Sequence, residues 1–292
     1  MHYYTSFGKK EVAENFAGDI LHLQFMRLHR FFARNLSESK QEPQFGGHSG
    51  TNSKEIVEGS IITYAHDTHQ WQRVFRYGQG DRVILFDGSG NDYVCEILAF
   101  PGEINGVTTG ATLRVVEVRM NTVQPARQVI LVVALVKKDT FEWIVEKATE
   151  LGVTEIIPIL AEHSEKKNLN MERLEKILVE AAEQSGRGDV PVLREVRDVK
   201  EIMKDKKIVS NSSAIVFDPS GRKFTKDDFT IGKGGKGKHK DERVAVFVGP
   251  EGGWSPEELG LFKKVGLPIL SLGPQVLRTE TAVVAVLSRL VF

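Results

Sequence analysis

The chain has 292 residues, 41% of them hydrophobic, and its 39 lysines and arginines balance its 39 aspartates and glutamates. This length fits one large domain or two of ordinary size, and the apolar content is ordinary for a globular protein with a sizeable core. A net charge of zero neither supports nor excludes a nucleic-acid partner, because local patches matter more than totals.

A few residue counts exclude whole classes of site. Cys95 is the one cysteine, so neither an internal disulfide nor a cysteine metal cluster is possible, and we expect a protein of the reducing cytoplasm. His69 and His163 have no second ligand at i+4, so we expect packed or surface histidines and no metal site. No run of about 18 apolar residues occurs, so we expect no membrane-spanning helix.

The N-terminal part of the chain reads as short strands at close spacing. Residues 1–25 are expected to form a loosely attached extension, and residues 37–53, rich in Ser, Gly, Gln and Asn, a flexible excursion. The β-rich runs, separated by turns, predict a small β-barrel over residues 26–122. The predicted strands are 26–32, 56–64, 82–87, 93–100 and 112–118.

After Pro125, apolar strands alternate with helices, which predicts an α/β domain with a mostly parallel sheet over residues 123–292. Strands are predicted at 129–136, 155–160, 214–218, 244–248 and 269–272. Helices are predicted to begin at cap sequences in 139–142 and 255–258, and to cover 171–186 and 279–291. Residues 223–243, dense in glycine and lysine, are expected to form a mobile basic loop.

Two glycine loops follow predicted strands near the C-terminus, GPEGG at 249–253 and GPQVLRTETA at 273–282. Glycines directly after a buried strand allow positive φ and let a ligand approach the backbone. Ligands of open α/β sheets bind outside the carboxyl ends of the strands, so the two loops predict one shared pocket. The chain contains no GxxxxGK[ST] or GxGxxG pattern for phosphates; the loops instead offer amides and carbonyls suited to an adenine edge and a ribose.

The run LGPQVLRTETA, residues 272–282, resembles the LGxxxLRxETA signature of the SPOUT methyltransferases that modify uridine N3 in 16S ribosomal RNA. VGPEGG at 248–253, KATELGV at 147–153 and AAEQS at 181–185 with Arg187 are similar to three further signatures of that family. HRFF at 29–32 and VFR at 74–76 with Gly80 and Asp81 resemble its RNA-binding PUA-like domain. The match covers residues 26–292, and its motifs stand in the family's order.

The resemblance implies an N-terminal PUA-like β-barrel and a C-terminal SPOUT domain whose chain forms a trefoil knot. It also implies a homodimer with the active site near the subunit interface, S-adenosyl-L-methionine as cofactor, and small-subunit ribosomal RNA, within the 30S subunit, as substrate. The cofactor-binding residues implied by the resemblance are Leu135, Asp218, Pro219, Val248, Gly249, Pro250, Glu251, Gly252, Gly253, Leu272, Gly273, Val276, Leu277, Arg278, Thr279, Thr281 and Ala282.

The resemblance also makes Arg30 and Arg76 of the barrel region candidates for contacts with RNA phosphates, although an arginine there is usually a surface charge. Arg187, at the end of a predicted helix, has two readings, a local ion pair or an RNA contact.

Methylation at N3 of uridine sets its own requirement. N3 is a poor nucleophile until its proton is lost, so a site must accept the proton or stabilise the resulting anion. Arg278, at the start of the predicted last helix, can stabilise the anion together with the amides of that helix N-terminus. Glu280 is either the base or a residue that caps the helix or orders Arg278; Thr279 and Thr281 are expected to be caps.

Two other functions fit the same sequence. One is a SPOUT methyltransferase that acts on a ribose 2′-hydroxyl or on transfer RNA. The other is a non-catalytic RNA-binding or ribosome-assembly protein that retains the fold.

Overall fold

The computed structural model describes residues 28–34, 36, 55–64, 68–100, 103–104, 107–108, 110–123, 127–165, 169–209, 213–225, 228 and 243–291. The chain divides into two compact units between Met120 and Asn121, and each is described by itself. The expected extension (1–25), the excursion (37–53) and residues 229–242 of the Lys/Gly-rich segment lie outside the described residues. No helix in the described part of the chain is long and apolar enough to cross a membrane.

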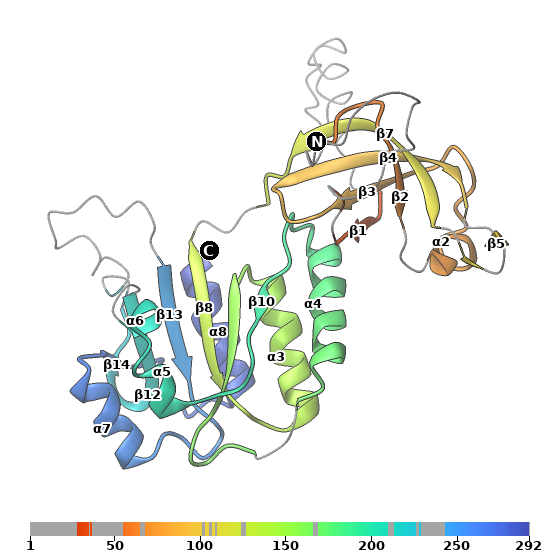
Figure 1. The fold of residues 1–292 in the computed structure, drawn as a ribbon. Helices are drawn as coiled ribbons and strands as arrows, with labels where there is room; N and C mark the ends of the chain where they lie inside the picture. The colour runs from red at the N-terminus through yellow and green to blue at the C-terminus, as the bar shows by residue number, and fades with distance from the viewer. Residues whose placement is uncertain are drawn as a thin grey trace, which may run out of the picture. The chain divides into compact units, whose positions relative to one another are not determined.

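The N-terminal unit is built on a five-stranded sheet in the order β1-β3-β4-β7-β2, antiparallel except for the β1–β3 pair (Figure 1). The hydroxyl of Tyr64 in β2 donates to the carbonyl of Phe32 in β1 (3.2 Å), so the two edge strands approach and the sheet curls like a barrel. The elements are β1 Arg30–Phe32, β2 Ile61–Tyr64, α2 His69–Arg73, β3 Arg82–Phe86, β4 Asn91–Ala99, β5 Glu103–Ile104, β6 Val107–Thr108 and β7 Ala111–Met120.

One hydrophobic cluster fills the N-terminal unit. Trp71 of α2 is 1% exposed and packs against Phe31 of β1 and Tyr64 of β2. Cys95 in β4 lies in the same cluster, and its burial raises the pKa of the thiol to about 12. Cys95 is therefore a packed core residue that stays protonated and unreactive near neutral pH.

The C-terminal unit alternates strands and helices. Its sheet has the order β10-β9-β8-β13-β12-β14, with β11 also pairing with β9, and every pair is parallel. The elements are β8 Gln128–Ala134, α3 Lys138–Glu150, β9 Glu155–Leu160, α4 Met171–Ser185, β10 Val192–Leu193, β11 Arg197–Asp198, α5 Val199–Ile202, α6 Lys206–Val209, β12 Ser213–Lys223, β13 Arg243–Val248, α7 Pro256–Lys264, β14 Ile269–Ser271 and α8 Thr279–Val291.

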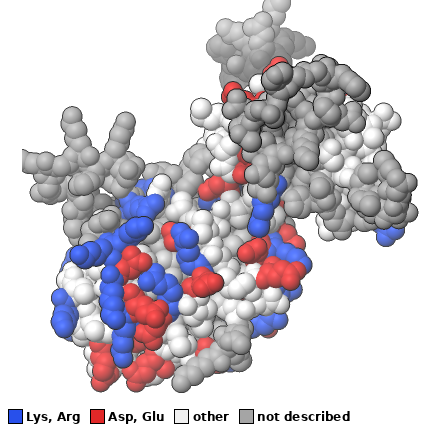
Figure 2. Space-filling model, viewed as in Figure 1, with Lys and Arg blue, Asp and Glu red and all other residues white. Residues whose placement is uncertain are grey.

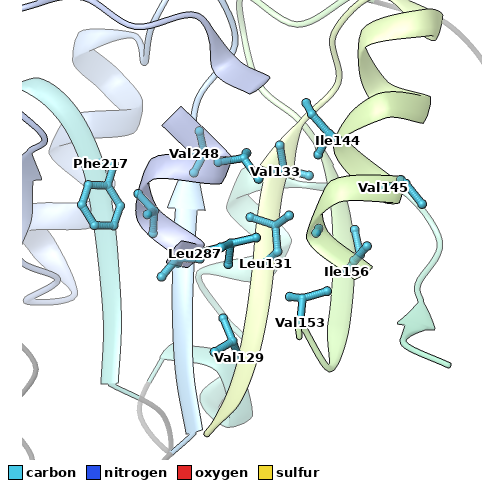
Figure 3. Packing of buried hydrophobic residues seen from close by; sticks show 14 of the residues in the cluster. Val129, Leu131, Val133, Ile144, Val145, Val153, Ile156, Phe217, Val248 and Leu287 are labelled. Atoms are coloured by element: carbon cyan, nitrogen blue, oxygen red, sulfur yellow. The ribbon is translucent and has the colours of Figure 1, made fainter. Parts of the chain in front are cut away.

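The parallel sheet is covered on both faces, which explains why its strands read as continuous apolar runs. Val129, Leu131 and Val133 of β8 face the layer of α3, α4 and α8 (Figures 1 and 3). The alternate residues of the same strand, Ile130 and Val132, face the layer of α5, α6 and α7. Each such side chain contributes about 1.5–3 kcal/mol by leaving water, so the central strands are a rigid base for the loops at their ends.

Local sequence patterns predicted the start of one helix correctly and the start of another wrongly. Ser255 caps α7 with a complete capping box: its hydroxyl accepts from the backbone of Glu258, whose carboxylate accepts from the backbone N–H of Ser255, and Pro256 is the first helical residue. The cap expected in residues 139–142 is wrong: α3 begins at Lys138, after Lys137, without a side-chain cap. Asp139 instead lies in the first turn, where its charge suits the helix dipole.

The last part of the chain returns from the edge of the sheet to its middle. β14 lies outside β12, which separates it from β13. Helix α8, however, packs on the same hydrophobic cluster as β13 and α3, through Val283, Val286 and Leu287. Residues 272–278 therefore pass the carboxyl end of β12, and this crossing brings the two glycine loops together.

Candidate active site

A cavity of about 90 Å³ lies at the carboxyl ends of β12, β13 and β14. Three loops form it: the bend inside β12, the GPEGG loop after β13, and the segment between β14 and α8. Its walls are mostly apolar, with the carboxylates of Asp218 and Glu251 among the few charged groups. The lining residues are Phe217, Asp218, Pro219, Val248, Gly249, Pro250, Glu251, Gly253, Trp254, Ser271, Leu272, Gln275, Val276, Leu277, Thr279 and Ala282.

The bend inside β12 makes the first wall. Phe217 and Arg222 both stand opposite Leu270 of β14, so the four residues between them loop out of the strand. Asp218 closes this loop, because its carboxylate accepts from the backbone N–H of Ser220 (2.9 Å) and from the Ser220 hydroxyl (2.5 Å). At Gly221 a Cβ would lie 2.6 Å from the carbonyl oxygen of Ile269, so only glycine lets the chain rejoin the sheet there.

Behind this bend, an ion pair holds the chain after β12. Arg222 donates to both carboxylate oxygens of Asp228, which also accepts from the backbone and hydroxyl of Thr225. The side chain of Asp228 is 3% exposed, and the Arg222 guanidinium lowers the pKa of this carboxyl to about 2. Phe224, between the two charges in sequence, packs against Phe217 at the cavity wall (5.3 Å between ring centroids). The pair therefore supports the first wall from behind.

The GPEGG loop is held by Trp254, a residue that the sequence prediction missed. Its indole Nε1 donates to the carbonyl of Phe217 (3.0 Å), which ties the end of β13 to the end of β12. A Cβ on Gly249 would lie 3.0 Å from the same ring, so the glycine lets the backbone pack directly on the indole. The available signal was a tryptophan immediately after a glycine loop, because a buried indole N–H needs an acceptor nearby.

A neighbouring loop holds the other side of GPEGG. The His163 ring, after β9, is 3.1 Å from the carbonyl oxygen of Gly253, and Glu258 accepts from the backbone N–H of Glu162 (2.9 Å). A Cβ on Gly252 would lie 2.8 Å from the Cβ of His163. Gly252 thus allows close packing against His163; it does not line the cavity.

Thr279 joins the second and third walls. Its hydroxyl donates to the carbonyl of Gly249 (3.0 Å), and only 3% of the residue is exposed. The expectation that Thr279 is a helix cap is therefore wrong, since its hydroxyl links two loops and the residue is already the first of α8. On the outer rim, Val276 is 79% exposed and Leu277 36% exposed.

Most of the predicted cofactor residues gather at this cavity. Among them, Leu135, Gly252, Gly273, Arg278 and Thr281 do not line it. Leu135 is 3% exposed and lines a separate small cavity between β8, α3 and α4. Besides Trp254, the cavity contains three residues that were not predicted, Phe217, Ser271 and Gln275, because a buried strand end or a loop side chain carries no distinguishing pattern.

The two predicted catalytic residues lie at the start of α8. The carbonyl of Arg278 accepts from the backbone N–H of Ala282 (2.9 Å), so Arg278 directly precedes the helix. Its side chain is exposed and has no hydrogen bond or ion pair with any described residue. Glu280 is half-buried in the first turn of the helix and forms no ion pair with Arg278. The guanidinium is therefore available to a ligand beside the cavity.

The three predicted RNA-binding arginines have different environments. Arg187 is 2% exposed, donates to the carbonyls of Thr149 (2.9 Å) and Val153 (2.7 Å), and pairs with both oxygens of Asp189. An RNA contact by Arg187 is thus wrong, because the guanidinium is buried and already bonded; the local ion pair is the correct reading.

Arg30 forms an ion pair within the N-terminal unit. Its side chain is 12% exposed and forms a two-point ion pair with Asp92 (2.7 Å at each contact), whose side chain is 5% exposed. This ion pair joins β1 to β4, and the RNA contact predicted for Arg30 stays a prediction. Arg76, in contrast, is exposed and forms no hydrogen bond or ion pair with any described residue. Among the described side chains, no three of His, Cys, Asp and Glu cluster as a metal site would require.

Comparison with known proteins agrees with this arrangement. Residues 123–291 match the family model of the RNA methyltransferase domain, and residues 72–100 match that of the RNA methyltransferase PUA domain. Two relatives, from Rickettsia conorii and Bacillus subtilis, are each called ribosomal RNA small subunit methyltransferase E and are each 27% identical to this chain. The matches cover 80% of this chain and 91% of the first relative, and 76% and 86% for the second.

Solved structures extend the likeness to the fold of both units. A putative methyltransferase from Legionella pneumophila, in complex with the cofactor S-adenosylmethionine, is 25% identical with a TM-score of 0.70, over 90% of this chain and 97% of that one. A ribosomal RNA small subunit methyltransferase E from Neisseria gonorrhoeae has a TM-score of 0.69 at 21% identity, over 90% and 96%. The expected fold class, an α/β SPOUT-type domain with a mostly parallel sheet after a PUA-like domain, is confirmed.

Proposed function

The chain belongs to the RNA methyltransferase family, and from this premise we propose that it transfers the methyl group of S-adenosylmethionine to N3 of a uridine in small-subunit ribosomal RNA. The substrate class is supported by the relatives named for methylation of small-subunit ribosomal RNA. The cofactor is supported by the Legionella pneumophila protein crystallised with S-adenosylmethionine. The observation that carries the proposal is one cavity formed by three loops, beside an exposed Arg278 that has no partner among the described residues.

The cavity fits this cofactor in its chemistry. Apolar side chains such as Val248 and Leu272 suit the faces of an adenine, and the backbone of the glycine loops suits its edge and the ribose. Asp218 and Glu251 line the cavity, and their negative charges would favour a cationic sulfonium bound there. When bound, the cofactor supplies an electrophilic methyl group, and the transfer itself is an in-line displacement that depends mainly on positioning.

The protein must then bind the uracil and either accept its N3 proton or stabilise the anion that forms. Uracil that has lost its N3 proton spreads the negative charge over N3 and the two carbonyl oxygens beside it. The Arg278 guanidinium and the first amides of α8 are the groups that stabilise this charge. Glu280 accepts the proton or orients the start of α8; Glu280→Gln separates these roles, because glutamine keeps the shape but cannot accept the proton at neutral pH.

A direct experiment tests the function. The purified full-length protein is incubated with radiolabelled S-adenosylmethionine and small-subunit ribosomal RNA, free or in 30S particles, from a strain that lacks the enzyme. We expect label in the RNA and one 3-methyluridine by nucleoside mass spectrometry. Label on a ribose oxygen or in transfer RNA would support the alternative targets, and cofactor binding without transfer to any RNA would support a non-catalytic role.

We also propose a cytoplasmic homodimer that acts on the 30S subunit, with the knot closed where residues 272–278 cross the end of β12. The exposed Val276 and Leu277 support the dimer, because apolar side chains concentrated on one rim are typical of an interface. Light scattering should give twice the chain mass, and Val276→Asp should lower it towards the monomer. A monomeric mass for the unmodified protein would contradict the dimer.

A further inference from the structure

Aromatic side chains in the N-terminal unit form a continuous series from the core to the surface. Tyr64 stacks on Trp71 with 16° between the ring planes, and Trp71 contacts Phe31 at 4.7 Å between ring centroids. Phe31 meets Phe75 at 6.0 Å, and Phe75 meets His29 at 4.0 Å. The inner rings are buried and Phe75 is half-buried, whereas His29 at the outer end is exposed. The series thus presents an aromatic ring to solvent on a rigid base.

The ring of His29 is held at its edge as well as on one face. Tyr77 approaches it edge-on at 5.8 Å, and the Tyr77 hydroxyl is 2.5 Å from Nδ1 of His29. Burial raises the pKa of Tyr77, so this hydroxyl stays protonated near neutral pH. An exposed surface histidine normally samples several rotamers. Here the contacts with Phe75 and Tyr77 fix the orientation of the ring before any ligand arrives.

Between Phe75 and Tyr77 the backbone takes an uncommon conformation. Arg76 has φ 57°, and it is the only non-glycine residue with positive φ among the described residues. Such a conformation costs on the order of 1 kcal/mol for a residue with a Cβ. It lets Phe75 and Tyr77 both contact His29 while Arg76 remains exposed. Strain of this kind concentrates where a ligand is bound.

The local charge favours a polyanion. Residues 68–81 contain two exposed arginines, Arg73 and Arg76, and one acid, Asp81, which accepts from the backbone N–H of Gly78 and whose charge acts on Tyr77. The α/β unit differs, since basic and acidic side chains are interleaved over the face drawn in Figure 2. Charge alone therefore does not locate an RNA surface on that face, whereas arginines next to an exposed aromatic ring are the combination that binds unpaired nucleotides.

We propose that His29, supported by Phe75 and Tyr77, is a stacking platform for one unpaired base of the RNA substrate, with Arg76 and Arg73 contacting the adjacent phosphates. This inference depends on the proposed function in one respect only, the identity of the RNA that is bound. Stacking accepts any base, because every base has an aromatic face. The platform therefore selects an unpaired nucleotide by its accessibility, and specificity for the methylated uridine lies elsewhere.

Fluorescence of a single-stranded RNA oligonucleotide that carries one 2-aminopurine tests this inference with the full-length protein. Stacking on His29 should quench the probe, and His29→Ala should abolish the quenching and weaken binding about tenfold. His29→Phe should restore most of the affinity, because the ring and not the imidazole is required. Arg76→Ala should also weaken binding and, unlike His29→Ala, it should reduce the dependence of affinity on salt, by about one unit of slope.

The controls separate this inference from the proposed function. Trp143→Ala removes an exposed ring from α3 and should leave binding of the probe unchanged. Because the assay measures RNA binding and not methyl transfer, its result tests the stacking platform independently of catalysis. Unchanged affinity in His29→Ala, or an equal loss for single-stranded and fully paired RNA, would overturn the platform. In transfer assays, His29→Ala should raise KM for RNA and leave kcat and the affinity for S-adenosylmethionine unchanged.

Discussion

The two units of this protein make their sites in different ways. In the N-terminal unit, the proposed RNA-binding surface consists of an exposed histidine ring and exposed arginines on a curled sheet. In the C-terminal unit, the candidate site is a cavity between loops at the ends of parallel strands. The cavity depends on hydrogen bonds that side chains of one loop donate to backbone carbonyls of another, from Thr279 to Gly249 and from Trp254 to Phe217. The surface of the N-terminal unit depends on how single side chains are supported.

Four arginines were predicted to contact RNA or the cofactor, and they divide in the same way within each unit. One of each pair forms an ion pair inside its unit, and the other is exposed. Arg30 and Arg187 form ion pairs that hold elements together; the side chain of Arg187 is 2% exposed and that of Arg30 is 12% exposed. Arg76 and Arg278 are exposed and have no partner among the described residues. We infer that the buried arginines stabilise their units, while the exposed ones contact RNA. The predictions below test this division.

The largest effect is expected for Arg278→Ala. Loss of a group that stabilises developing negative charge should lower the methyl-transfer rate about 10²- to 10³-fold. The melting temperature should stay close to that of the unmodified protein, because the side chain is exposed and forms no hydrogen bond or ion pair with a described residue. Single-turnover transfer and calorimetry on the same preparation measure both. A normal transfer rate would remove Arg278 from the mechanism.

Arg187→Ala should mainly lower the stability of the fold, in contrast to Arg278→Ala, which should mainly lower the transfer rate. It removes the side-chain donor to the carbonyls of Thr149 and Val153, the first of which keeps its bond from the N–H of Gly152, and it leaves Asp189 without this ion pair. The loss should cost about 3 kcal/mol of unfolding free energy. Denaturant unfolding measures this cost. Arg194→Ala is the matched control, since Arg194 is 55% exposed in its ion pair with Glu155 and should cost less than about 1 kcal/mol. Equal effects of the two variants would contradict a structural role for Arg187.

Thr279→Val should weaken cofactor binding and change the stability of the fold only slightly. Valine keeps the shape but loses the hydrogen bond to Gly249, and a bond of this kind contributes about 0.5–1.5 kcal/mol. We expect the affinity for S-adenosylmethionine to fall about three- to tenfold in isothermal titration calorimetry. Thr281→Val is the control, because Thr281 is exposed and does not line the cavity. If the two variants bind S-adenosylmethionine equally well, the hydrogen bond between Thr279 and Gly249 is not required for cofactor binding.

The smallest effect is expected for Asp228→Asn, and it should depend on pH. The pKa of Asp228 is about 2 in the folded protein, below its ordinary value of 3.8. The ionised carboxylate therefore stabilises the fold above about pH 4, and this contribution fades as the pH falls towards 2. We expect a difference on the order of 1 kcal/mol at pH 7 that shrinks by pH 3. Urea unfolding across this range measures it, and a difference independent of pH would contradict the ion pair with Arg222.

Local patterns predicted the regular elements well where the cause is local. The capping box of α7 needs only Ser255, Pro256 and Glu258, and the sequence shows all three. The extent of α8, Thr279–Val291, also follows from its own residues. The expected cap in 139–142 was wrong because a suitable pattern lay one residue inside a helix that packing begins at Lys138. The short elements β10, β11, α5 and α6 were not predicted, since they are too short to show a period.

The sequence by itself determined the class of fold, the two-unit organisation and the loops that contain the site, because apolar periodicity and glycines act on the chain nearby. Only the tertiary structure decided what individual side chains do. Arg187 is buried because Thr149, Val153 and Asp189 surround it. Thr279 meets Gly249 because the chain leaves β14, beyond β12, and returns to α8, which packs against β13. Burial and loop contacts depend on segments far apart in the chain, and no local pattern records which of them meet.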